Sequence, residues 1–486
     1  MGEYTRLIFL LVLLNASEFG IEYLYAIPYA ATIFKLPFYL STIISVFIGP
    51  VIGIIVQLVI GSCSDWFNSR WGKRRPFLLL GNLIVIISIG IQVISGIVEV
   101  VSPSKENDFS TFQFIFLMIG LCLLYVGTNI LQVVSRTLVL DIIPIEHQHP
   151  CALMFIALSL FARLIIHITF LIIESIDYTS GIGVKVRSIT VLVLYSLAIF
   201  IVPLTSTITF FTATESFIPA DRVPLFIFIK SCLKSILAIN RYTVCNWLIL
   251  LFGWMSFVAF DSCNTELFHF YSVVFYEKSL NIITPDIMSR IQSIIFAFAQ
   301  LGYCIYMLTK KQYPWYMMSI SNAITSLISF LPLTLSSICF YSSIRIELLN
   351  SSNLLLMMSL SCIFIIPVAF SSAQLLSIPF ALLKNIVPSS HFGLFVGIFN
   401  CGIIFAQQLL YGLNYAFFES YYSSQHTITM NDFFKHKDLI PIFCCIAILL
   451  YLITSIAAYF IRWVYNYHDI KDGFIENTMS SSESEN

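Results

Sequence analysis

Polar side chains occur at helical spacing inside several long apolar stretches of this 486-residue sequence. Residues three or four positions apart lie on the same face of a helix. An ionisable side chain inside a bilayer is costly and usually faces a cavity or a partner. Five such faces cannot all contact lipid, so we expect them to converge on a central cavity. The five stripes contain Asn15, Glu18, Glu22, Tyr25 and Tyr29; Tyr125, Asn129, Gln132 and Arg136; Ser159, Arg163, His167 and Glu174; Trp254 and Asp261; and Asn400 and Gln407.

These residue types suit a ligand that is rich in hydroxyl groups. Side-chain amides both donate and accept hydrogen bonds, and carboxylates accept them, so together they can satisfy hydroxyls. Aromatic faces can cover the apolar C–H faces of a sugar ring. The guanidinium of Arg136 can form a two-pronged hydrogen bond with a carboxylate or with two hydroxyls. The candidate ligand-binding residues are Glu22, Tyr25, Asn129, Gln132, Arg136, Trp254, Asp261, Asn400 and Gln407.

Structural roles remain open for the same side chains. Asn129 and Gln132 could form hydrogen bonds between helices and nothing more. Arg136 could form an ion pair with Glu22 or Asp261. Arg163 and His167 could be structural counter-charges of the bundle.

A second group of candidate residues lies in the stretch GSCSDWFNSRWGKRRP at residues 61–76. Gly61 and Gly72 allow a close backbone approach and a tight turn. Asp65 can pair with a nearby cation or face the positive N-terminal end of a helix in another part of the bundle. Such contacts exist only when that side of the bundle is closed, so they bias a two-state equilibrium. A role in topology alone stays open. The candidate gating residues are Gly61, Asp65, Gly72, Lys73, Arg74 and Arg75.

The composition indicates a membrane protein, because 58% of the residues are hydrophobic and only 10% are charged. Apolar stretches long enough to cross a hydrocarbon core as helices recur along the whole chain. We therefore predict an all-α integral membrane protein with about twelve spans in two six-helix bundles. The predicted spans lie near 6–34, 39–63, 77–101, 111–140, 148–176 and 189–211, and near 243–271, 287–308, 315–341, 353–383, 392–417 and 439–465.

The loops predict the orientation and the domain boundaries. Lys and Arg are more frequent in the loops that would be cytoplasmic if the N-terminus is cytoplasmic, as the positive-inside rule requires. The segment Asn350-Ser351-Ser352 then becomes a possible glycosylation site outside. We predict an N-terminal bundle at 1–211, a cytoplasmic linker with an amphipathic interfacial helix at 212–242, a C-terminal bundle at 243–465 and a disordered cytoplasmic tail at 466–486.

Two bundles of six spans, with a basic loop after the second span, resemble the layout of major facilitator transporters. The spacing from GxxSD to GKRRPF resembles the sucrose transporter family, which belongs to the glycoside-pentoside-hexuronide:cation symporter group and has animal proton-linked relatives. Further resemblances run in chain order through most of the sequence. They are PFYLSTIISVFIGPVIGIIVQLVIG, NILQVVSRTLVLD, GWMSFVAFD and IPFALLKNIVPSSHFGLFVGIFNCGIIFAQQL.

The resemblance implies a secondary transporter that moves sucrose, or another disaccharide or glucoside, by alternating access. One position departs from the family. Tyr125 stands where proton-coupled plant members carry an Asp. Proton coupling could instead use Glu22 or Asp261 against Arg136, and we favour retained coupling. The alternatives are an uncoupled sugar facilitator and a sugar sensor that does not transport.

Other classes of protein are less well supported. The sequence contains neither an HExxH nor a GxSxG motif, which would have indicated an enzyme. The scattered cysteines do not have zinc-site or disulfide spacing, so we expect no metal and no cofactor. The net charge of −1 argues against nucleic acid as a partner. We expect a monomer that binds a sugar and protons in a lipid bilayer, with the plasma membrane as the default location and both termini cytoplasmic.

Overall fold

The fold was taken from a computed structural model of the chain, in which part of the sequence is described. All the regular elements among the described residues are helices. The described residues are 48–101, 111–180, 183–213, 215, 224–237, 239, 241–278, 285–309, 351–422, 449–450 and 452–457.

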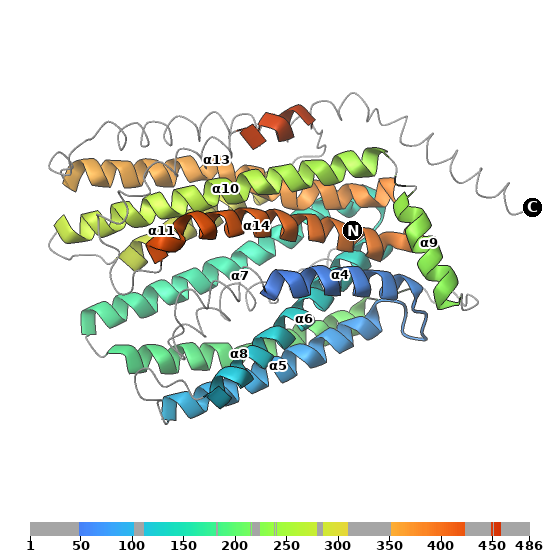
Figure 1. Cartoon of the computed structure of the whole chain (residues 1–486), viewed down its shortest axis with the longest axis horizontal. Helices are drawn as coiled ribbons and strands as arrows, with labels where there is room; N and C mark the ends of the chain where they lie inside the picture. The colour runs from blue at the N-terminus through green and yellow to red at the C-terminus, as the bar shows by residue number, and fades with distance from the viewer. Residues whose placement is uncertain are drawn as a thin grey trace, which may run out of the picture.

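Nine of the described helices are long and apolar enough to cross a membrane, and the shorter helix α9 lies between the fifth and sixth of them. Figure 1 shows the nine running roughly along one axis, with α9 across one end of the bundle. The helices are α4 (Gly49–Trp66), α5 (Arg75–Val101), α6 (Thr111–Ile142), α7 (Ile145–Ser180), α8 (Gly183–Thr212), α9 (Leu225–Leu237), α10 (Arg241–Lys278), α11 (Pro285–Leu308), α13 (Ser351–Ile386) and α14 (Phe392–Tyr422), and a 3₁₀ turn, η4 (Ser389–His391), precedes α14.

Nine predicted spans correspond to these nine helices, although α10 continues to Lys278, beyond the predicted end near residue 271. The predicted spans near 6–34 and 315–341 lie outside the described residues. So does most of the span near 439–465, and so does the tail at 466–486. The helix α9 occupies part of the predicted linker at 212–242.

The outer faces of the helices are apolar and the inner faces hold the polar groups. On α4, Val51, Ile55 and Val59 are exposed, whereas Gln57 and Asp65 are buried. On α5, exposed positions include Leu83, Ile87 and Ile94, and buried positions include Asn82, Ser88, Gln92 and Ser95. A soluble protein shows the reverse distribution. The arrangement fits a bundle whose outer surface contacts lipid.

We call the helices before α9 (α4 to α8) the first half of the bundle, and those after it (α10, α11, α13 and α14) the second half. Particular helix pairs pack within and between these halves. Within the first half, α5 packs on α6 and α8, and α4 packs on α6. Within the second half, α10 packs on α13 and α14. Between the halves, α4 packs on α14, and α7 packs on α11 and α13. The helix α6 also contacts α14, so α4, α6 and α14 meet at the boundary between the halves.

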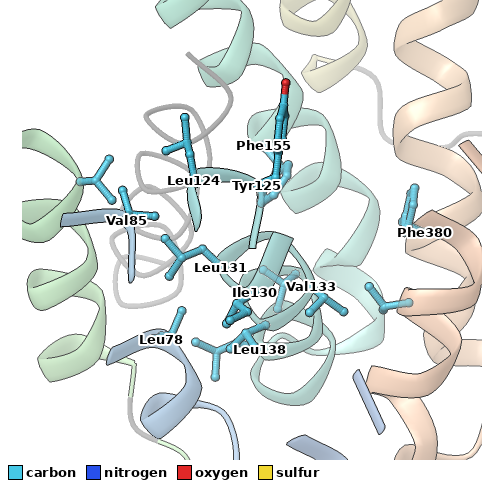
Figure 2. Close-up of a cluster of buried hydrophobic side chains, with 14 of the residues drawn as sticks. Leu78, Val85, Leu124, Tyr125, Ile130, Leu131, Val133, Leu138, Phe155 and Phe380 are labelled. Atoms are coloured by element: carbon cyan, nitrogen blue, oxygen red, sulfur yellow. The ribbon is translucent and has the colours of Figure 1, made fainter. Parts of the chain in front are cut away.

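The largest apolar core lies around α5 and α6 and extends to that boundary. Figure 2 shows Leu78 and Val85 of α5 near the α6 residues Leu131 and Leu138, with Phe380 of α13 on the other side. A smaller cluster joins the halves through α7, α11 and α13 and includes Leu153, Leu160, Met307 and Ala373. These contacts fix α6 and α7 as the elements that position the candidate site.

Candidate functional site

The helices α4 and α14 approach so closely that only glycine fits at two facing positions. A Cβ atom at Gly61 would lie 2.3 Å from the carbonyl oxygen of Gly393, and a Cβ atom at Gly393 would lie 2.3 Å from the carbonyl oxygen of Gly61. One turn farther along, a Cβ atom at Gly397 would lie 2.6 Å from the carbonyl oxygen of Gln57. Real Cβ atoms do not approach this closely, so the two halves are in backbone contact here.

Asp65 lies at the end of this contact and joins the two halves. Its Oδ1 accepts a hydrogen bond from the backbone N–H of Gly393 at 2.9 Å, and its Oδ2 accepts one from Leu394 at 2.8 Å. These N–H groups belong to the first turn of α14, which has no intrahelical acceptors for them. A carboxylate at a helix N-terminus also interacts favourably with the helix dipole.

Arg74 completes the same group from the turn before α5. Its guanidinium donates to Oδ1 of Asp65 at 2.5 Å, to Oδ2 of Asp141 at 2.8 Å and to Oγ of Ser64 at 2.6 Å. The Arg74 side chain is 1% exposed. Burial alone would lower its pKa, but the carboxylates of Asp65 and Asp141 raise the pKa above its ordinary value. The guanidinium therefore stays charged, and we call Asp65, Arg74, Asp141 and the first amides of α14 the charged latch.

Glu215 holds the turn that presents Arg74. Its carboxylate accepts hydrogen bonds from the backbone N–H groups of Lys73 and Arg74, the latter at 3.1 Å. Gly72 has a φ of +100° and faces the same carboxylate, so a side chain at this position would be strained and would also clash. Arg75 donates to the carbonyl of Ala213 and lies over the ring of Phe210. The predicted gating residues Gly72, Lys73 and Arg74 therefore form the turn around Glu215.

A polar network lies deeper in the bundle, on the faces of α4 and α6 that meet near the boundary. The amide of Gln57 donates to Oδ1 of Asn129 at 2.7 Å and to Oε1 of Gln132 at 2.8 Å. Asn129 in turn donates to the carbonyl of Tyr125 at 2.7 Å. Gln57 is 1% exposed and Asn129 is 4% exposed, whereas Gln132 is half-buried.

Arg136 connects that network to the second half. Its Nη1 donates to Oδ1 of Asn400 on α14 at 2.6 Å. The guanidinium also lies 4.3 Å from the ring centre of Phe380 on α13 and 5.5 Å from that of Phe155 on α7. A guanidinium over aromatic faces gains cation–π attraction. Arg136 therefore contacts both halves at one point.

A second charged group lies between α7, α10 and α11. Asp261 interacts electrostatically with Arg163. Arg163 also lies 5.5 Å from the ring centre of Phe296 and donates a 3.4 Å hydrogen bond to His167. Spacing alone suggested Arg136 as the charged partner of Asp261, whereas the structure brings Arg163 to it. Trp254, two turns before Asp261, is buried. Its ring centre lies 5.0 Å from that of Phe257, which lies 6.0 Å from that of Phe296.

The buried polar atoms that have no hydrogen-bond partner among the described residues include Oε1 of Gln57, Nδ2 of Asn400, Nε1 of Trp254 and Nδ1 of His167. Asn400 is 2% exposed. Leaving a buried polar group unsatisfied costs free energy unless a ligand or water satisfies it. Towards a polar ligand, Oε1 of Gln57 can accept a hydrogen bond, and Nδ2 of Asn400 and Nε1 of Trp254 can donate one.

The structure places the remaining candidates as follows. Glu22 and Tyr25 lie outside the described residues. Gln407 is half-buried on α14, two turns beyond Asn400. Tyr125 is buried in the apolar core, where its ring would be 2.8 Å from a Cβ atom at Gly49.

Sequence reasoning did not single out Gln57, Asp141 or Glu215. For Gln57 a signal was present, since a glutamine in an apolar span lies four residues before Gly61 and eight before Asp65, on the same helical face. Asp141 appeared only as part of a motif. Glu215 lies 142 residues from Lys73, and no local pattern connects the two.

Comparisons with solved structures identify the fold. The chain has the fold of a major facilitator transporter. A solved proton:xylose symporter of this superfamily matches with a TM-score of 0.58 and 13% identity over 92% of this chain and 94% of that one. A fucose transporter in the outward conformation matches with a TM-score of 0.58 and 12% identity, over 94% and 97% of the two chains. The chain is accordingly a multi-pass membrane protein.

Comparison with the sequences of known proteins confirms the resemblance to the sucrose transporter family. A general alpha-glucoside permease of Schizosaccharomyces pombe is 31% identical over 101 residues, which are 21% of this chain and 18% of the permease. A sucrose transport protein of Arabidopsis thaliana is 31% identical over 100 residues, 19% of this chain and 17% of that protein. A human membrane-associated transporter protein is 32% identical over 88 residues, 17% and 16% of the two chains. The matched stretch thus spans only 16% to 18% of these relatives' length. No protein-family model matches the chain.

Proposed function

We propose that this protein is a secondary transporter that moves a sugar across a membrane by alternating access. The observation that carries the proposal is the polar network of Gln57, Asn129, Gln132, Arg136 and Asn400 at the boundary between the halves. In major facilitator proteins the substrate binds near mid-membrane between the two halves. A site at this boundary is supported by Oε1 of Gln57 in the first half and Nδ2 of Asn400 in the second, which have no hydrogen-bond partner among the described residues.

The chemistry of the network favours a hydroxylated ligand. A hydroxyl group can donate to Oε1 of Gln57 and accept from Nδ2 of Asn400, which are the roles those atoms leave open. The indole N–H of Trp254 can donate to a further ligand oxygen while the ring covers an apolar face. A neutral sugar can be bound by these amides together with Arg136, whose guanidinium can donate to hydroxyl groups. The named relatives act on sucrose and alpha-glucosides, so we propose sucrose or another disaccharide or glucoside as the substrate.

The charged latch supports the alternating-access mechanism. It joins the end of α4 to the start of α14, so the bundle is closed at that end. We assign this end to the cytoplasm, because the basic run at residues 73–75 lies there. The substrate would enter from the other side, contact the network and leave after the latch opens. We further propose a monomer in the plasma membrane with cytoplasmic termini.

Proton coupling is proposed at Asp261. This carboxylate lies in a membrane-spanning helix of the second half, and its electrostatic partner Arg163 lies on α7 in the first half. Protonation of Asp261 removes that attraction and so changes the relative free energy of states in which α7 and α10 are close. Glu22, the other coupling candidate, stays a prediction.

One observation favours an uncoupled facilitator as the second candidate function. Tyr125 occupies the position of a family carboxylate, and it is buried among apolar residues such as Leu121 and Leu124. Tyr125 therefore supplies no carboxylate for proton binding at this position. A facilitator would equilibrate the sugar and would not respond to a pH gradient.

Uptake into proteoliposomes containing the purified protein tests these assignments. Labelled sucrose, maltose, a glucoside and a monosaccharide would each be tested with and without an imposed pH gradient. We expect accumulation of a glucoside-type sugar driven by the gradient, and we expect Asp261→Asn to retain exchange but lose gradient-driven accumulation. Equal uptake with and without the gradient would favour the facilitator. No uptake of any sugar would contradict the transporter proposal and leave the sensor.

A further inference from the structure

The helix α9 lies across the end of the bundle that holds the charged latch (Figure 1). One of its faces packs on the protein. Phe228 has its ring centre 6.1 Å from that of His391, and Oγ of Ser231 lies 3.4 Å from Nε2 of His391. Cys232 is buried on the same face. His391 comes two residues before Gly393, so α9 contacts the segment that supplies the latch amides.

The opposite face of α9 is apolar and has no packing partner among the described residues. Phe226 is 78% exposed and Leu237 is 88% exposed. Ile229 and Leu233 are exposed between them. The spacing of three or four residues puts all four side chains on one side of the helix. Four large exposed apolar side chains on a 13-residue helix are unfavourable against water.

Two lysines border this apolar face. Lys230 and Lys234 are exposed and lie four residues apart, next to Phe226, Leu233 and Leu237 around the helix. The sequence between Leu225 and Arg241 contains no Asp or Glu, so the helix has no acidic group to balance them. A helix with large apolar side chains and neighbouring lysines is typical of segments that lie in the interface of a membrane.

We infer that this face of α9 is a binding site for an anionic phospholipid surface. The four apolar side chains enter the boundary between headgroups and acyl chains, and Lys230 and Lys234 contact the lipid phosphates or carboxylates. The position of α9 favours this occupant, because the helix lies across the end of nine helices that are long and apolar enough to span a membrane. Its two positive charges select anionic over neutral lipid, by roughly fivefold for each lysine.

Lipid binding at α9 would also act on the latch. The inner face of the helix holds His391, and η4 continues directly into α14. Anchoring α9 to the membrane surface therefore restrains the first turn of α14, where Gly393 and Leu394 bind Asp65. Anionic lipid is thus expected to stabilise the closed latch.

Hydrogen–deuterium exchange of the full chain in nanodiscs tests the site without reference to transport, so its outcome is independent of the proposed function. We would compare phosphatidylcholine alone with phosphatidylcholine plus phosphatidylserine. Backbone amides of residues 225–237 are expected to exchange at least about fivefold more slowly with the anionic lipid, and high salt should reduce the difference. Peptides from α11 serve as the internal reference.

Variants separate the charge from the apolar contact. Lys230→Gln with Lys234→Gln should remove the dependence on anionic lipid, whereas Arg70→Gln, an exposed basic residue elsewhere at the same end, should keep it. Phe226→Ser with Leu233→Ser should speed the exchange in both membranes. Equal exchange of wild-type α9 in the two lipids would overturn the proposal. Protection that depends on protein concentration and not on lipid charge would overturn it in favour of a second copy of the chain.

Discussion

Arg136 and Asn400 lie 264 positions apart in the sequence and are joined by a 2.6 Å hydrogen bond between Nη1 and Oδ1. The bond connects α6 to α14 and therefore the first half to the second. Phe380 of α13 also packs on the guanidinium, so Arg136 has a hydrogen bond and its closest aromatic contact with the second half. Any rocking of the halves that separates α6 from α13 and α14 must break both.

This relationship predicts that Arg136→Lys is not a conservative change. Lysine keeps the charge, but it has no planar group to lie over Phe380. Its ammonium group also lacks the fixed pair of N–H donors with which a guanidinium can bind Asn400 and a ligand hydroxyl together. We expect sugar uptake to fall at least about tenfold, which corresponds to the loss of one charge-assisted hydrogen bond. Initial uptake rates at several sugar concentrations check this. Arg70→Lys, an exposed arginine, is the control and should transport normally. Normal uptake by Arg136→Lys, or by Arg136→Ala, would contradict a central role.

The sequence predicted the charged latch in outline but not its partners. Asp65 at the end of a span, and basic residues before the next, follow from the local pattern of residues 61–76. The pattern does not show that the partner helix is α14, because Leu394 lies 329 residues away. Asp141 and Glu215 join Arg74 through the packing of α6 and α8, which no local periodicity encodes.

The polar stripe of α6 illustrates the same limit. Spacing predicts one shared face for Tyr125, Asn129, Gln132 and Arg136, of which Tyr125 lies in the apolar core. Their contacts differ, since Asn129 and Gln132 accept from α4 while Arg136 donates to α14. Which neighbour each residue meets depends on the rotation of three helices about their axes. Spacing within one helix contains no information on that rotation.

The close approach of α4 and α14 predicts a specific effect of Gly61→Ala. The added Cβ would lie 2.3 Å from the backbone carbonyl oxygen of Gly393, and backbone cannot move aside as a flexible side chain can. The state with this end closed should lose stability, and uptake should fall several-fold as the state with this end open becomes favoured. Uptake rates, with apparent Tm as a check on folding, test this.

A matched control exists for that substitution. A Cβ atom at Gly90 on α5 would meet nothing within 4 Å. Gly90→Ala should therefore transport normally and can gain slight stability, because alanine favours the helix more than glycine does. Equal uptake by Gly61→Ala and Gly90→Ala would argue against the tight contact.

Asp65→Asn should destabilise the protein more than its small change in shape suggests. The substitution keeps an oxygen but places an amide N–H₂ against the donors of Gly393, Leu394 or Arg74. Removing one partner of a buried ion pair typically costs roughly 3–5 kcal/mol. Asp141 retains part of the attraction for Arg74, so we expect the lower end of that range, seen as a lower apparent Tm and impaired uptake.

The double variant Asp65→Asn with Arg74→Gln separates charge from shape. If an uncompensated buried charge causes the loss, removing the guanidinium as well should restore part of the Tm, and the two effects should not add. Fully additive losses would show that Asp65 and Arg74 act independently, contrary to the latch geometry. Uptake should stay low in the double variant, because the link to α14 is still weakened.

Glu215 predicts how stability depends on pH at the end of the bundle that holds the latch. Burial raises the pKa of its carboxyl above the ordinary value of 4.5, although the N–H groups of Arg74 and Lys73 partly oppose the shift. A raised pKa means that the folded state binds the proton more tightly than the unfolded state. Between 4.5 and the raised pKa, the contribution of this group to stability therefore decreases as pH rises.

Glu215→Gln should flatten that dependence, because the glutamine amide stays neutral and its oxygen can still accept from the turn at residues 72–74. We expect a higher apparent Tm than wild type near neutral pH and a smaller difference at acidic pH, where the wild-type carboxyl is protonated. A series of Tm measurements across this pH range checks the prediction. Glu99→Gln, near the other end of α5, is the control for the loss of one negative charge elsewhere in the chain. A Tm of Glu215→Gln that lies below wild type at neutral pH would show that ionised Glu215 stabilises the turn, because its bonds to the two amides then outweigh the cost of burying its charge.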